Sequence, residues 1–78
     1  MSESKLKHAA LSLAADITLK SMRHSPERCA RNLMELGLSA YPSSVSKEDH
    51  DIVYESFKIL CKKGDAAKAK DLFLSIFK

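Results

Sequence analysis

The chain has 78 residues and a formal net charge of +3 at pH 7, and 45% of its residues are hydrophobic while 29% are charged. This length fits one domain, and this composition excludes a disordered chain and a fibrous repeat. The mildly basic charge permits contact with nucleic acid without requiring it. Because the chain holds only two glycines and two prolines, we predict a single all-α domain over residues 1–78, folded as a compact bundle of four short helices.

The first predicted helix covers residues 4–24 and is apolar on two sides. At 100° per residue, one apolar stripe holds Leu6, Ala10, Leu13, Ala14 and Ile17, and the other holds Leu11, Ala15, Leu19 and Met22. A helix with two apolar sides usually packs between two neighbours. We therefore expect this helix to lie near the centre of the bundle.

Two lysines precede the short apolar run AALSLAA in this helix, which is the general pattern of a secretory leader. Asp16 ends the run early, and the run is too short to span a bilayer. We therefore expect no cleaved signal, no membrane contact and a cytoplasmic location.

The second predicted helix covers residues 26–36 and has clear boundary signals. Ser25 can cap it, Pro26 suits its first turn, and Gly37 fits the left-handed position just after a helix. Its apolar residues share one side, and they are Cys29, Ala30, Leu33 and Leu36. This pattern is typical of a surface helix with one buried face.

The third and fourth predicted helices cover residues 47–63 and 66–77, with only two residues between them. Ser46 is a good N-cap for the third helix. Gly64 can end that helix, and Asp65 can cap the fourth without a linker. We expect these two helices to form a tight antiparallel hairpin.

The residues from Phe57 to Ile76, FKILCKKGDAAKAKDLFLSI, resemble one helical hairpin of the tetratricopeptide and pentatricopeptide repeat class. The similarity consists of an LCKxG ending, a small residue and an LF pair, which are here Leu60, Cys61, Lys62, Gly64, Ala69, Leu72 and Phe73. The resemblance covers residues 57–76 only and implies the geometry of a hairpin. Because such repeat arrays need about three repeats to be stable, it does not imply a groove for peptide or RNA.

The sequence has no pattern typical of catalysis or of cofactor binding. Asp49, His50 and Asp51 are adjacent, but consecutive helical residues point about 100° apart, so their side chains do not converge. No short spacing of a zinc site occurs among the candidate metal ligands, which are His8, His24, His50, Cys29 and Cys61. We expect no enzyme activity, no cofactor, no metal and no small-molecule substrate, with both cysteines as buried free thiols.

The carboxyl-terminal run LFLSIF is the leading functional candidate. It places five large hydrophobic residues among six at the end of the chain. A small domain often covers such an excess by dimerising or by binding a partner helix. The leading hypothesis is a small interaction or regulatory module that forms a homo-oligomer, with Phe73, Leu74 and Phe77 as its contact surface.

A basic cluster around the joint between the first two helices supports an alternative hypothesis. It comprises Lys20, Arg23, Arg28 and Arg31, with His24 beside them. Such cations can contact nucleic-acid phosphates, although they can equally form a solvated face. The alternative is therefore a nucleic-acid-binding accessory domain.

Overall fold

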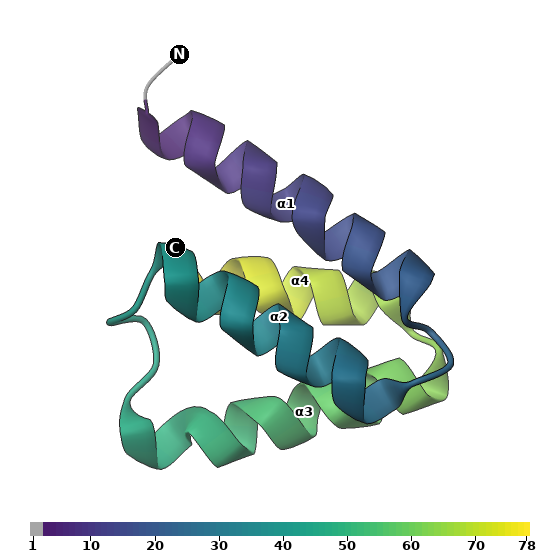
Figure 1. Ribbon diagram of the computed structural model, residues 1–78. Helices are drawn as coiled ribbons and strands as arrows, with labels where there is room; N and C mark the ends of the chain where they lie inside the picture. The colour runs from purple at the N-terminus through teal and green to yellow at the C-terminus, as the bar shows by residue number, and fades with distance from the viewer. Residues whose placement is uncertain (1–2) are drawn as a thin grey trace.

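The computed structural model describes residues 3–78, and α-helices account for most of them (Figure 1). The helices are α1 (Glu3–Ser21), α2 (Pro26–Ala40), α3 (His50–Lys63) and α4 (Ala66–Ile76), and a 3-10 turn, η1 (Lys47–Asp49), leads into α3. The residues that the structure describes form no strand. The prediction of an all-α bundle of four helices is confirmed.

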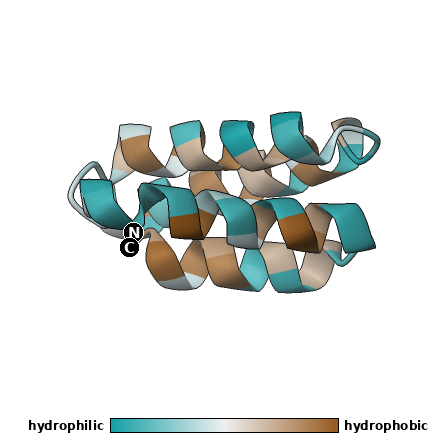
Figure 2. Ribbon diagram, turned by 90° about the horizontal axis from the view of Figure 1, so that it is seen from below, coloured by the Kyte–Doolittle hydropathy of each residue, from teal (hydrophilic) through white to brown (hydrophobic). Residues whose placement is uncertain are grey.

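The four helices form a ring in chain order. α1 packs on α2 and α4, and α3 also packs on α2 and α4. Consecutive helices run antiparallel, so the α1–α2 joint and the α3–α4 joint lie at the same end of the bundle (Figure 1). The α2–α3 loop and the carboxyl terminus lie at the opposite end. Along the helices, hydrophobic bands alternate with hydrophilic ones, as amphipathic packing requires (Figure 2).

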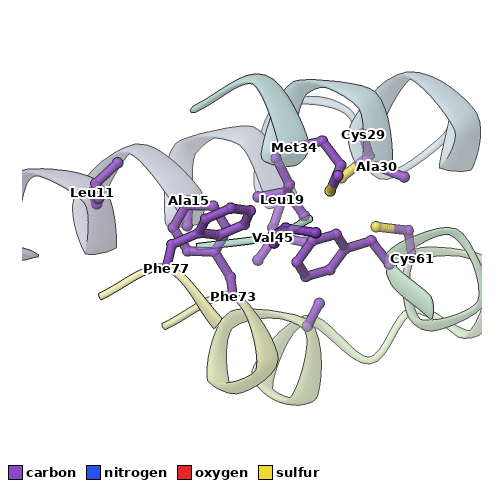
Figure 3. Close-up of a cluster of buried hydrophobic side chains, with 13 residues drawn as sticks. Leu11, Ala15, Leu19, Cys29, Ala30, Met34, Val45, Cys61, Phe73 and Phe77 are labelled. Carbon is purple, nitrogen blue, oxygen red and sulfur yellow. The ribbon is translucent and has the colours of Figure 1, made fainter. Parts of the chain in front are cut away.

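Three phenylalanines fill the middle of the core. Phe57 on α3, Phe73 on α4 and Phe77 just after α4 are fully buried. Their ring centroids lie 5.1 to 6.5 Å apart, within the range in which aromatic rings attract each other. The rings of Phe73 and Phe77 point into a cluster that Leu11, Ala15 and Leu19 of α1 also line (Figure 3).

The joint between α3 and α4 has the predicted geometry. Gly64 adopts a left-handed φ of 75°, its N–H donates to the Cys61 carbonyl at 3.1 Å, and the Asp65 N–H donates to the Leu60 carbonyl at 3.0 Å. This pair of bonds defines a Schellman ending. The Asp65 carboxylate then accepts a hydrogen bond from the Lys68 N–H at 3.2 Å, so Asp65 caps α4.

Gly37 does not end α2, which is a correction to the expected left-handed position. α2 continues to Ala40, and the Tyr41 N–H still donates to the Gly37 carbonyl at 2.8 Å. Gly37 is buried, and a Cβ added there would overlap the ring of Phe77. The position therefore suits glycine because Phe77 packs directly on the α2 backbone.

The amino-terminal end of α2 also departs from the expectation. Ser25 occupies the N-cap position, and its carbonyl accepts a hydrogen bond from the Cys29 N–H at 2.8 Å. Its side chain makes no capping hydrogen bond. Pro26 removes one of the amides that would otherwise need a partner.

Candidate interaction surfaces

The structure corrects the contact surface expected on α4. Phe73 and Phe77 are fully buried, and Leu74 is half-buried against the same core. Residues four apart lie on one face of a helical segment, and α4 turns this face toward α1 and α3. Phe73 and Phe77 therefore stabilise the fold and are not accessible to a partner in the folded chain.

The outer face of α1 carries the exposed apolar side chains instead. Of the two predicted stripes, the one with Leu11 and Leu19 is buried, whereas Leu6, Leu13 and Ile17 are 57%, 62% and 58% exposed. The expectation that α1 lies near the centre of the bundle is therefore wrong. In a ring of four helices each helix has neighbours on its inner side only, so the second stripe of α1 stays in solvent.

We define the α1 outer face as Leu6, Ala10, Leu13 and Ile17. Spacings of four, three and four residues place these side chains nearly in line over about 16 Å, at 1.5 Å per residue. Ala10 and the adjacent Ala9 are exposed and small, so another helix could approach closely here. No charged side chain lies on this line between Leu6 and Ile17, and Glu3 and Lys20 continue it at its two ends.

The other exposed large hydrophobic residues are Ile52 and Ile59 on α3. They lie two turns apart, and the polar Ser56 lies between them on the same side of the helix. Single exposed apolar residues are common on protein surfaces. These two isoleucines therefore form no continuous apolar stripe comparable with the α1 outer face.

The structure adds further cations to the basic cluster predicted at the α1–α2 joint. Lys20, Arg23, Arg28 and Arg31 are all exposed. Because both tight joints lie at one end, α3 and α4 bring more lysines to the same region. We call the combined set the basic end, and it comprises Lys20, Arg23, Arg28, Arg31, Lys62, Lys63 and Lys68.

A small pocket of about 290 Å³ opens at the basic end. The exposed Lys20 and Arg23 line it together with the joint residue Gly64. The buried Cys29 and Cys61 also line it. Its volume is at the lower limit of pockets that hold small organic ligands, and it suffices for a group such as a phosphate.

The two cysteines are free, as predicted, and both are buried. The Cys61 sulfur points into the core toward α2 (Figure 3). Burial, with a hydrogen bond to the Cys29 thiol as a second cause, raises the pKa of Cys61 to about 12. Since the thiolate is the nucleophilic form, Cys61 is protonated and unreactive at neutral pH.

The other residues considered for chemistry stay apart. Among residues 3–78, no three side chains of histidine, cysteine, aspartate or glutamate gather as a metal site would require. Asp49 ends the 3-10 turn and its carboxylate accepts a hydrogen bond from the Ser46 hydroxyl at 3.0 Å, while His50 begins α3. None of the helices that the structure describes is long and apolar enough to span a bilayer.

Comparisons of the chain with protein-family models, with curated proteins and with solved structures found no match. The resemblance of residues 57–76 to a tetratricopeptide-like hairpin stays a prediction.

Proposed function

We propose that this chain is a small interaction module that pairs with a second copy of itself through the α1 outer face. The observation that carries the proposal is the exposure of Leu6, Leu13 and Ile17 in one line. The proposal keeps the self-association expected from the sequence and moves the contact from α4 to α1. A helix with two apolar sides normally packs between two neighbours, and a second copy on the outer face of α1 would supply the missing neighbour.

The energy available from this contact is modest. Fully burying a Leu or Ile side chain gains about 1.5 to 3 kcal/mol, so covering a side chain that is more than half exposed gains about 1 to 2 kcal/mol. A pair of copies buries six such side chains, and association itself costs at least about 4 kcal/mol. The net gain is therefore between about 2 and 8 kcal/mol, so we expect a dissociation constant between tens of millimolar and the micromolar range, with a midpoint of roughly 0.2 mM.

The pattern of the α1 outer face favours a second copy over an unrelated helix. The spacing of four, three and four residues reads the same from either end of the stripe. In an antiparallel pair, Leu6 would therefore face Ile17 of the second copy, and Ala10 would face Leu13 of the second copy. A twofold interface requires this self-complementarity, and the small Ala10 leaves room for the larger leucine.

Light scattering over a range of concentrations tests the proposal. The wild type should show a mass that rises toward that of a dimer, and Ile17→Glu should stay monomeric. Ile52→Glu is the matched control, because Ile52 is 65% exposed but lies on α3. Circular dichroism should report the same helix content for all three proteins. A dimer that Ile17→Glu leaves intact, or that Ile52→Glu also abolishes, would remove α1 as the contact.

A further inference from the structure

We infer that the basic end of the bundle binds the phosphate backbone of a nucleic-acid duplex. This site is separate from the α1 outer face, and the inference does not depend on self-association. The observation behind it is the gathering of cations from all four helices at one end of the molecule.

The fold itself creates this gathering. Lys20 and Arg28 flank the α1–α2 joint, while Lys63 and Lys68 flank the α3–α4 joint. The joints are more than thirty residues apart in sequence, but antiparallel packing in a ring places them at the same end (Figure 1). Clustered cations repel one another, and this repulsion lowers the stability of the fold unless an anion binds there.

Few carboxylates compensate for these cations. The acidic residues as near to the two joints as Arg31 are Asp16, Glu27, Asp65 and Asp71, and Asp16 already pairs with Lys70 at 2.8 Å. Asp65 lies 3.9 Å from the Lys68 ammonium and also caps α4. Across residues 3–78, the other cations of the basic end make no ion pair within 4.0 Å, and these are Lys20, Arg23, Arg28, Arg31, Lys62 and Lys63.

Two cations also occupy positions that a helix normally gives to acidic residues. Arg28 and Lys68 each lie in the first turn of a helix, where the helix dipole disfavours positive charge. The carboxyl-terminal ends of α1 and α3 lie at the same end of the bundle and oppose the dipoles of α2 and α4. The positive potential therefore comes mainly from the side chains, which can reach an extended row of phosphates.

The chemistry of the basic end favours a duplex backbone over exposed bases. The tyrosines, Tyr41 and Tyr54, lie toward the other end of the bundle, and the three phenylalanines are buried. Proteins that bind single strands usually stack bases on exposed aromatic rings, which the basic end lacks. Because contacts to phosphate carry no sequence information, binding should be independent of base sequence.

Fluorescence anisotropy with labelled duplexes of about 20 base pairs tests the inference, at about 50 mM and about 200 mM salt. With about four phosphate contacts, the affinity should fall roughly 100-fold between these salt concentrations. A DNA duplex and an RNA duplex of the same sequence distinguish the two sources of the phosphate backbone. The double variant Arg28→Glu with Lys63→Glu should lose at least tenfold in affinity at the lower salt.

A control variant separates the basic end from net charge alone. Lys47→Glu with Lys78→Glu makes the same change in net charge away from the two joints, and its affinity should stay within about twofold of the wild type. Leu6→Glu alters the α1 outer face at the end of α1 away from the basic end and should still bind, so that failure of dimerisation and failure of this site are distinguishable. Circular dichroism should confirm the fold of every variant.

Three results would overturn the inference. The first is no binding of either duplex at the lower salt. The second is an equal loss of affinity in both charge variants. The third is displacement of the duplex by millimolar inorganic phosphate at constant ionic strength, which would indicate a site for a small anion.

Discussion

Replacing Gly37 by alanine should destabilise this protein, although the same change stabilises most helices. Gly37 lies inside α2 and is buried, and a Cβ at this position would overlap the ring of Phe77. Phe77 is fully buried and its ring packs near those of Phe57 and Phe73, so it cannot move without disturbing its neighbours. The methyl group would therefore force α2 and the carboxyl-terminal segment apart.

The magnitude follows from two opposing effects. Alanine in place of glycine within a helix normally gains about 0.5 to 1 kcal/mol in the free energy of unfolding. Inserting a methyl group into a well-packed core typically costs about 1 to 3 kcal/mol. The net loss should be about 1 kcal/mol, which corresponds to a decrease in melting temperature of about 4 to 8 °C for a domain of this size.

Thermal and urea unfolding of a double-mutant cycle measure this effect and its cause. In a Phe77→Ala background the overlap is absent, so Gly37→Ala should change sign and stabilise the protein by about 0.5 to 1 kcal/mol. Phe77→Ala alone should cost about 3 to 5 kcal/mol, so the cycle is best measured at low temperature, where the variant retains its fold. A Gly37→Ala protein that melts at a higher temperature than the wild type would refute the packing explanation.

Two further predictions concern a helix cap and a buried thiol. Asp65→Ala should lower the free energy of unfolding by about 1 kcal/mol, because it removes the capping hydrogen bond from the Lys68 N–H. Ser25→Ala should lower it less, because the Ser25 side chain makes no such bond. Urea unfolding measures both variants, and equal losses would contradict the assignment of the caps. Because the pKa of Cys61 is raised, its thiol contributes fully to the free energy of unfolding below the ordinary pKa of 9.0. This contribution is lost as the pH rises toward about 12. As the pH rises between these two values, the free energy of unfolding should fall less for Cys61→Ala than for the wild type. Equal decreases in both proteins would show that the thiol does not contribute.

The parts of the fold that follow from local chemistry could be predicted from the sequence. The α3–α4 joint is one, because a left-handed glycine and a capping aspartate act on their immediate neighbours. The role of Gly37 could not be predicted in the same way. A glycine followed by a leucine is typical of a helix end, and only the contact with Phe77, forty residues later, shows that the helix continues.

The two candidate surfaces could be predicted in part from the sequence. Both apolar stripes of α1 could be identified, but which of them is buried depends on how the four helices close into a ring. The cations of the α1–α2 joint were also identified. Lys62, Lys63 and Lys68 are not part of the predicted cluster, although four antiparallel helices with short first and last connections necessarily bring both joints to one end.

Nuclear magnetic resonance on the amide-labelled protein in a dilution series shows directly whether α1 is the contact between two copies. We expect concentration-dependent shifts at Leu6, Ala10, Leu13 and Ile17, with the amides of α3 and α4 unchanged. Shifts centred on another helix, or spectra that are identical from micromolar to millimolar concentration, would contradict this expectation.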